Sequence, residues 1–216
     1  MGIEHPLLER IGVRHAFGLR DDEPPHGLLQ PVQVHGAEVV WAEVWGGFRP
    51  EADAIVASAP IEAPIAVVTA DCVPLLASSP DGSAVAAIHA GWRGLAAGVI
   101  EAGIAALREA GGEVGAAAIG PHIGPCCYEV DAPVKRALAP RFDAELEAAL
   151  RPTRPDHWRL DLARLARAAL LRAGVAEAAI GSLEDDCTFC HERRFHSHRR
   201  DGPRSGRLTH WIARHG

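Results

Sequence analysis

The 216-residue sequence predicts a mixed α/β (α+β) fold in which helices cover β-sheets. Short apolar runs rich in β-branched residues recur along the chain, and such runs are typical of strands. Three longer segments, 95–110, 132–150 and 161–173, instead indicate helices. Strands and helices do not alternate strictly, so we expect mixed sheets rather than one parallel sheet.

Composition places the chain among ordinary globular proteins. Hydrophobic residues make up 48% of the sequence and charged residues 23%, and the length suffices for a full core. We therefore expect one domain spanning residues 1–216. The net charge of −6 argues against a nucleic-acid-binding protein. The sequence does not indicate an oligomeric state.

The N-terminal pattern and the lack of long apolar runs predict the cellular compartment. The N-terminus has no basic-then-apolar signal pattern, and no run approaches the roughly 18 apolar residues of a membrane span. We therefore expect a cytoplasmic protein that does not enter membranes. In that reducing compartment the five cysteines indicate metal binding, catalysis or burial rather than disulfides.

Strands are expected wherever an apolar or alternating run is bounded by turn residues. In the first, Val13, His15 and Phe17 alternate. A Pro-rich connection is expected at 151–158. The expected strands lie within 10–20, 38–44, 52–58, 65–76, 83–90, 114–120, 179–183 and 208–213.

The strongest local signal is a β-hairpin within residues 63–94. One apolar run spans 65–76 and a second spans 83–90, with Ser-Pro-Asp-Gly at 79–82 between them. Ser first, Pro second and Gly last are the preferences of a type I turn. If these four residues form the loop, residue 78 faces residue 83, and the residue numbers of every facing pair along the two strands add up to 161.

That register places two reactive side chains together. Cys72 lies directly opposite His89 on one face, with Cβ atoms roughly 5 Å apart. A thiol and an imidazole so placed indicate either a pair of metal ligands or a nucleophile with its base. Pro74 cannot donate to a ladder, and it therefore indicates an edge strand or a bulge.

The helix after the hairpin is predicted at 95–110. Leu95, Val99, Gly103 or Ile104, and Leu107 form its buried stripe, and Gly111-Gly112 stands at the C-cap. A glycine-flanked helix start offers free N–H groups to an anion, and Arg93 stands there. The sequence therefore predicts a phosphate site near Arg93.

The second half of the chain predicts one further amphipathic helix at 161–173. Its apolar side is expected to carry Leu162, Leu165, Ala169 and Leu170, and Gly174 ends it. In the tail, Arg199 and Arg200 are candidate contacts for an anion or substrate.

The tail also carries Cys187-x-x-Cys190-His191, formally an attachment pattern for c-type haem. Haem attachment usually requires export, so we do not expect haem here. A structural zinc site with a nearby histidine is one alternative, and a turn with buried thiols is the other. The Cys126-Cys127 pair is expected to pack at a helix entry.

Several motifs in combination resemble the bacterial laccase-domain family, also called YfiH-like or polyphenol oxidase-type proteins. Together they extend over about residues 31–207. The motifs are Gln33-Val34-His35-Gly36, Ala70–Leu76 (ADCVPLL), His89–Gly94 (HAGWRG), Gly120–Val130, Cys187-Thr188 and Arg199–Gly202.

The resemblance implies a layered α/β sandwich with mixed sheets, related to predicted cysteine hydrolases. It also implies a zinc ion, or copper, held by His35, Cys72 and His89. Three protein ligands leave an open position, as in catalytic zinc sites. The activities implied are phosphorolysis of adenosine, inosine or methylthioadenosine with phosphate, and deamination of adenosine.

The remaining candidate residues follow from their neighbours. Asp71, beside Cys72, is a candidate for proton transfer or for orienting a metal ligand, and Arg93 is the second catalytic candidate. Arg93 also counts among the substrate-binding candidates, which are Gln33, Arg93, Arg199 and Arg200.

Two other functions compete with this one. The first is a metal-free cysteine hydrolase with Cys72 as nucleophile and His89 as base. The second is a non-catalytic zinc-binding module centred on Cys187 and Cys190. A multicopper oxidase is not expected, because it needs paired His-x-His motifs and only His196-Ser197-His198 has that form.

Overall fold

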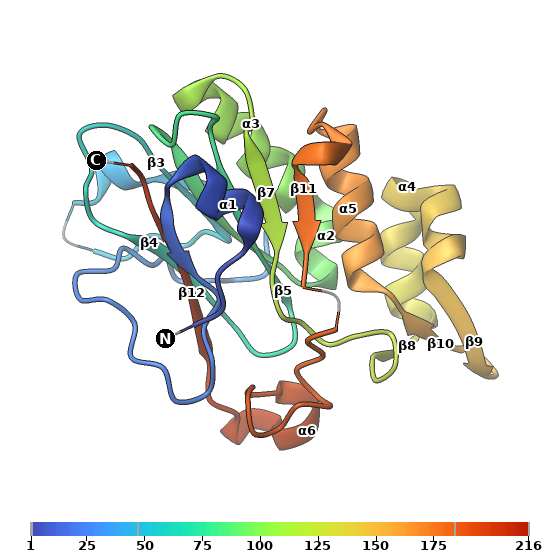
Figure 1. The fold of residues 1–216 in the computed structure, drawn as a ribbon. Coiled ribbons are helices and arrows are strands. Elements are labelled where there is room, and N and C mark those ends of the chain that lie inside the picture. The colour runs from blue at the N-terminus through green and yellow to red at the C-terminus, as the bar shows by residue number, and fades with distance from the viewer. Residues whose placement is uncertain (1, 47, 184, 216) are drawn as a thin grey trace.

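A computed structural model describes residues 2–46, 48–183 and 185–215. It confirms a mixed α/β architecture built from several sheets and flanking helices (Figure 1). No helix within these residues is long and apolar enough to cross a membrane.

The regular elements follow the predicted apolar runs closely. The helices are α1 (Pro6–Ile11), α2 (Trp92–Ala97), α3 (Val99–Gly111), α4 (Ala132–Ala149), α5 (Leu162–Arg172) and α6 (His198–Asp201). The strands are β1 (Arg14–Ala16), β2 (Val39–Trp41), β3 (Ala54–Ala57), β4 (Ile65–Thr69), β5 (Val73–Ser78), β6 (Val85–Ala90), β7 (Ala116–Ile119), β8 (Glu129–Asp131), β9 (Leu150–Arg154), β10 (His157–Leu160), β11 (Ile180–Ser182) and β12 (Leu208–Ala213).

A six-stranded sheet with the order β11-β7-β5-β6-β3-β2 forms the centre of the molecule. Its outer pairs, β11 with β7 and β3 with β2, are parallel, and its inner pairs are antiparallel. Every residue of β5 and β6 is buried, which explains why these strands are continuous apolar runs rather than alternating ones.

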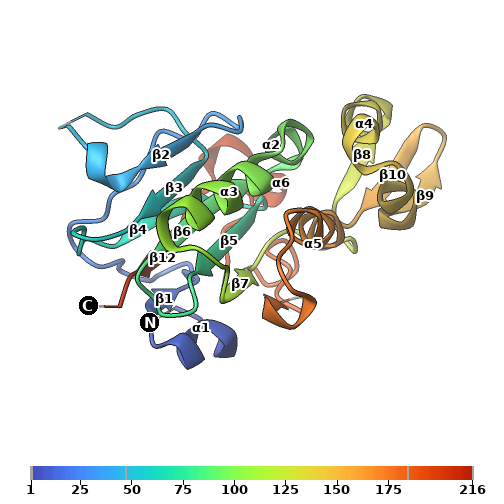
Figure 2. The same ribbon diagram turned by 90° about the horizontal axis from the view of Figure 1, so that it is seen from above.

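The two faces of this sheet are covered differently. On one face Leu75 and Ile88 join the core formed with helices α2 to α5. On the other face Leu76 and Ala87 pack with Phe17 and with the antiparallel sheet β1-β12-β4. Figure 2 shows α3 and β12 on opposite sides of the central strands. The result is a layered sandwich, as expected from the resemblance.

A third, antiparallel sheet with the order β8-β10-β9 stands to one side with α4 (Figure 2). Residues 151–158, which were expected to be a Pro-rich connection, instead form most of the hairpin of β9 and β10. Pro155 and Asp156, with φ 58° at Asp156, turn the chain between β9 and β10. Pro152 faces Trp158 where the register shifts, so its missing N–H falls at a bulge.

The run predicted as one strand at 65–76 is in fact two strands in different sheets. β4 pairs with β12, whereas β5 lies in the middle of the six-stranded sheet. The chain crosses between them at Asp71, whose φ is 93°, and Cys72. Apolar residues on both sides of the crossing hid this break from the sequence pattern.

The predicted turn at 79–82 forms, with the Gly82 N–H donating to the Ser79 carbonyl at 3.1 Å. The predicted pairing of the two hairpin strands is nevertheless wrong by two positions. Ser83 belongs to the loop, and the Ser79 N–H donates to the Ala84 carbonyl. His89 therefore faces Pro74 rather than Cys72. Cys72 itself lies just outside this ladder, which begins with Val73 paired to Ala90, so its meeting with His89 does not follow from the hairpin register.

Pro74 lies in a central strand, so the expectation of an edge strand or bulge is wrong. Its carbonyl accepts from Gly120 at 2.9 Å, on the side of β7. The reciprocal bond, from an N–H at position 74 to the Gly120 carbonyl, cannot form at proline, and the β5–β7 ladder ends at the next pair, Leu75 with Ile119.

The predicted helix at 95–110 begins earlier, at Trp92, and is divided at Gly98. The φ of Gly98 is 92°, a conformation that favours glycine. The predicted stripe is confirmed, since Leu95, Val99, Ile104 and Leu107 are all buried. Gly112 is the C-cap of α3, as expected.

Candidate metal-binding active site

Three side chains from distant parts of the sequence converge at one end of the central sheet. His35 comes from the loop before β2, Cys72 from the crossing between sheets, and His89 from β6. One ligand atom of each lies within 4.8 Å of the other two. The rings of His35 and His89 meet edge to face, with centroids 4.8 Å apart. The structure thus brings together the three residues that the resemblance implied as metal ligands.

Local backbone geometry places the thiol. The φ of 93° at Asp71 directs the chain so that Cys72 turns toward His89 instead of continuing a strand. Gly91 leaves the room that this needs, because a Cβ there would lie 2.9 Å from Cys72 Sγ and 3.3 Å from His35 Cδ2. An L side chain at position 91 would collide with two of the three ligands.

Asp53, at the start of β3, organises the site and was not singled out by the sequence analysis. Its buried carboxylate accepts a 2.7 Å bond from His89 Nδ1 and bonds from the backbone N–H groups of Val34, His35 and Gly36. One side chain thereby orients His89 and the loop that carries His35. With Nδ1 held by Asp53, Nε2 of His89 is free for another ligand, an arrangement typical of metal-binding histidines.

The protonation states also suit metal binding. Burial raises the pKa of the Cys72 thiol, but hydrogen bonds with His35 and His89 outweigh it and lower the pKa to about 6. Burial lowers the pKa of His89, yet its contacts with Asp53 and Cys72 raise it to about 9. Burial likewise opposes ionisation of Asp53, while bonds from His89 and Gly36 bring its pKa below the usual value. The thiolate, which is the form that binds metals, is therefore favoured.

A cavity of about 620 Å³ opens beside these ligands. This volume lies within the range of small-molecule sites. Its lining includes His35, Cys72 and His89 together with the guanidinium-bearing residues Arg49, Arg93, Arg199 and Arg207. A metal-ligand set and a strongly basic wall therefore face the same space.

Arg93 is the arginine best placed to meet a ligand in this cavity. It is exposed and stacks on the ring of Trp92, with the guanidinium carbon 4.3 Å from the ring centroid. Arg49 and Arg207, in contrast, donate to backbone carbonyls. Among the described residues, Arg93 has no ion pair or hydrogen-bonded partner, so its fork of donors is available to an anion.

Two of the other predicted residues line the cavity but are already engaged. Gln33 exchanges two hydrogen bonds with the backbone of Val68, at 2.7 and 2.8 Å. The buried Asp71 accepts from the Thr188 hydroxyl and from the Arg199 backbone N–H, both at 2.6 Å. In this structure both side chains hold the walls of the cavity in place.

The two arginines of the tail separate. Arg199 lines the cavity. Its guanidinium carbon lies 5.0 Å from the Tyr128 ring centroid, and the guanidinium donates a hydrogen bond to the Glu129 carbonyl. Arg200 is not among the lining residues. Its guanidinium bonds to Asp201 and to the carbonyls of Thr188, Phe189 and Phe195. The sequence treated these neighbours alike, and the structure brings only Arg199 to the site.

The donor set of His35, Cys72 and His89 fits a zinc ion. Two imidazoles and a thiolate are donors that zinc accepts, and three protein ligands leave a position toward the cavity. Copper also binds sets of two histidines and one cysteine. The described residues contain only one other group that could hold a metal, and it consists of cysteines alone.

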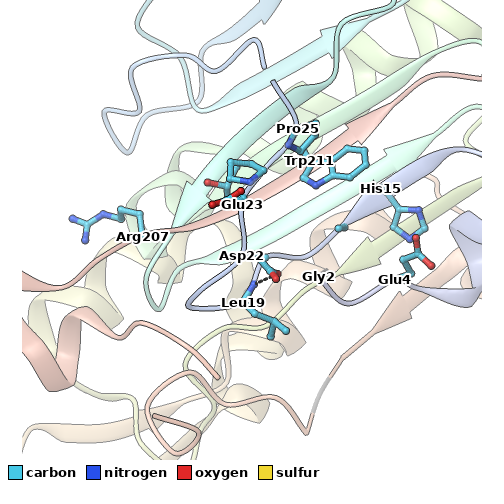
Figure 3. Close-up of a pocket in the computed structure, with 13 residues that line it drawn as sticks. Gly2, Glu4, His15, Leu19, Asp22, Glu23, Pro25, Arg207 and Trp211 are labelled. Carbon is cyan, nitrogen blue, oxygen red and sulfur yellow. Dashed lines mark hydrogen bonds between the residues drawn. The ribbon is translucent and has the colours of Figure 1, made fainter. Parts of the chain in front are cut away.

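A second cavity, of about 480 Å³, lies between the N-terminal segment and β12 (Figure 3). Its lining includes His15, Trp211 and the carboxylates of Glu4, Asp22 and Glu23, and the Asp22 carboxylate accepts the Leu19 N–H at 2.8 Å. None of the predicted site residues lines this space. The predicted chemistry therefore belongs to the cavity beside His35, Cys72 and His89, and Arg207 lines both spaces.

The chain is similar to known proteins over nearly its whole length. Residues 13–215 match the model of a family described as multi-copper polyphenol oxidoreductase laccase. A Xylella fastidiosa (strain Temecula1) protein named purine nucleoside phosphorylase is 44% identical over 197 residues, which are 87% of this chain and 72% of that protein. The Escherichia coli protein named purine nucleoside phosphorylase YfiH is 37% identical over 182 residues, covering 83% and 71%.

Solved structures agree with this likeness. A Neisseria meningitidis protein superimposes with a TM-score of 0.79 at 35% identity, over 88% of this chain and 75% of that one. A Bacillus licheniformis hypothetical protein named YfiH gives 0.82 at 26% identity, over 94% and 93%. These two TM-scores show that this chain has the same fold as both proteins.

Proposed function

The chain belongs to the family described as multi-copper polyphenol oxidoreductase laccase, and from this premise we propose that it is a purine nucleoside phosphorylase. Relatives from several bacteria carry that name. The single observation that carries the proposal is one cavity lined both by a histidine–cysteine set and by Arg93, whose guanidinium has no hydrogen-bonded or ion-pair partner among the described residues. Phosphorolysis needs a nucleoside and an anion in one site, and this cavity offers room and charge for both.

Arg93 is the proposed phosphate ligand. Its planar guanidinium matches two phosphate oxygens at once, and stacking on Trp92 limits its motion. The helix that follows is only six residues long, so the proposal rests on the side chain rather than on the helix start. Phosphate bound by Arg93 would lie in the same cavity as His35, Cys72 and His89.

The nucleoside is proposed to occupy the remaining space, between the ligand set and Arg199. Tyr128 and Trp92 present aromatic surface to the cavity, which suits a purine base. Arg199 and Gln33 complete the proposed substrate-binding walls. Asp71 acts there by positioning, because its carboxylate holds Thr188 and Arg199.

His35, Cys72 and His89 are the proposed ligands of a zinc ion. Zinc with three protein ligands supplies Lewis-acid chemistry toward a substrate or a water molecule. The chain's own part is to keep Cys72 as thiolate and, through Asp53, to hold the His89 imidazole and the backbone of His35 in place. The same site is also proposed to deaminate adenosine, a separate reaction in which water adds at C6 of the purine and ammonia leaves, so that phosphate is not needed.

Product analysis tests the proposal. The purified protein is incubated with adenosine, inosine or methylthioadenosine, with and without phosphate. Phosphorolysis predicts free purine base and a ribose 1-phosphate product, formed only with phosphate. Inosine formed from adenosine without phosphate reports deamination. Unchanged nucleosides under all conditions, with the metal bound, would refute the proposed function.

A further inference from the structure

Four of the five cysteines form a second cluster, separate from Cys72. Cys126 and Cys127 precede β8, and Cys187 and Cys190 follow β11, yet all four sulfur atoms lie within 4.8 Å of one another. From the sequence, the first pair was expected to pack at a helix entry, and the second to form a turn with buried thiols or a zinc site with a histidine. The structure replaces that histidine with two thiols.

The spacing of the sulfur atoms suits a tetrahedral metal. Zn–S bonds of about 2.3 Å imply sulfur atoms roughly 3.8 Å apart around a tetrahedral ion. Cys126 and Cys190 are separated by 3.7 Å between Sγ atoms, and Cys127 and Cys190 by 3.3 Å. Cys190 is thus close to both members of the other pair, whereas a disulfide could join it to only one of them.

Both cysteine pairs are carried on tight turns. In the first, the N–H groups of Cys127 and Tyr128 both donate to the Gly124 carbonyl at 3.0 Å. In the second, the His191 N–H donates to the Cys187 carbonyl at 3.1 Å. Short backbone bonds of this kind hold the thiols in position before any ion binds.

Gly124 adds a further feature of a thiolate site. Its N–H donates to Cys187 Sγ at 3.2 Å, a bond that stabilises a negatively charged sulfur. A Cβ on Gly124 would lie 3.3 Å from Cys126 Sγ and 3.4 Å from Cys187 Cβ, so this backbone sits tightly against the cluster.

We propose that Cys126, Cys127, Cys187 and Cys190 bind one zinc ion in a closed structural site. Four sulfur ligands leave no position for substrate, as in structural zinc sites. None of the four lines the cavity with His35, so this ion is distinct from the proposed catalytic one. Its binding joins two loops that are far apart in the sequence.

The joined loops support the active-site cavity. Figure 1 shows the loop before β8 beside the segment after β11, and the Thr188 N–H donates to the His122 carbonyl at 3.0 Å. Thr188 directly follows Cys187 and bonds to Asp71, which in turn holds Arg199. A zinc ion in the cluster therefore fixes the C-terminal segment that reaches the cavity.

Zinc itself is the probe, in a Cys72→Ala background, where every remaining thiol belongs to the cluster. The protein is reduced, loaded with zinc, desalted and analysed by metal quantification and native mass spectrometry. We expect about one zinc ion per chain in this background. We also expect the four thiols to resist iodoacetamide until a chelator is added.

Cys190→Ser in the same background keeps an exposed position polar, and it should lower zinc affinity about 10²-fold or more. Glu192→Gln, an exposed neighbour outside the cluster, is the matched control and should retain zinc. Rapid alkylation in the presence of zinc would overturn the proposal. So would a disulfide found by mass under non-reducing conditions, or a cluster that takes iron but not zinc. These readouts do not depend on turnover, so the proposal stands or fails independently of the phosphorylase activity.

Discussion

The two proposed metal sites differ in whether their ligands leave a fourth coordination position open. His35, Cys72 and His89 leave one side open to a basic cavity, whereas four cysteines surround the second centre without lining that cavity. Open three-ligand sites are typical of catalysis and closed four-ligand sites of structural support. If both proposals hold, one site serves the reaction and the other holds two loops together.

The sets also differ in how they are supported. The first depends on a buried carboxylate, Asp53, which reaches His89 and three backbone N–H groups. The second depends on backbone turns and on the Gly124 N–H. We therefore expect substitutions near the first set to change activity, and substitutions near the second to change the order of the C-terminal segment.

Cys72→Ala should have the largest effect. Loss of a Lewis acid worth several kcal/mol predicts phosphorolysis slower by roughly 10³-fold. Metal analysis should show about one ion fewer per chain, with the four-cysteine cluster still loaded. Lost activity without any lost metal would instead support the metal-free hydrolase, in which Cys72 is the nucleophile.

Arg93→Ala should slow phosphorolysis by roughly 10²-fold and raise the KM for phosphate, because a charged contact to the anion is lost. Deamination, which needs only water, should suffer less. Arg136→Ala, at an exposed position on α4, is the matched control. Equal loss of both reactions with an unchanged KM for phosphate would show that Arg93 does not bind phosphate.

Asp53→Asn should weaken metal binding at the first set by about 10- to 100-fold, since asparagine keeps the size but not the charge that orients His89. Competition with a chromophoric chelator measures this affinity. Asp131→Asn, on the exposed cap of α4, should leave it unaltered. A variant that lost metal from the four-cysteine cluster instead would contradict the assignment of Asp53.

Thr188→Val should have the smallest effect, about 1.5 kcal/mol of unfolding free energy, because Asp71 loses one hydrogen bond. Denaturant unfolding of the zinc-loaded protein measures it. Thr153→Val removes an exposed hydroxyl bond to Glu129 and is the matched control. If the two variants were equally stable, Thr188 would not link the cysteine cluster to the cavity wall.

Local sequence patterns predicted most of the secondary structure. The apolar runs of β3, β7 and β12 and the stripes of α3 and α5 lie where expected, since burial imposes its period directly on the sequence. The exposed, Arg- and Pro-rich hairpin of β9 and β10 was missed, because it buries little apolar surface. The crossing at Asp71 was missed for the opposite reason, as both flanking strands are buried.

Residue identity and a family resemblance were enough to predict, without the fold, that His35, Cys72 and His89 lie together as candidate metal ligands. They could not identify Asp53, whose partners His89 and His35 are 36 and 18 positions away. They could not predict that Cys127 and Cys190, 63 positions apart, lie in contact. They also could not predict that Arg199 lines the cavity while its neighbour Arg200 does not. The sequence shows which side chains could react or bind a ligand. A functional site also requires that such side chains, distant in the sequence, lie close together in space. That meeting is decided by how the sheets pack and where the loops between them return.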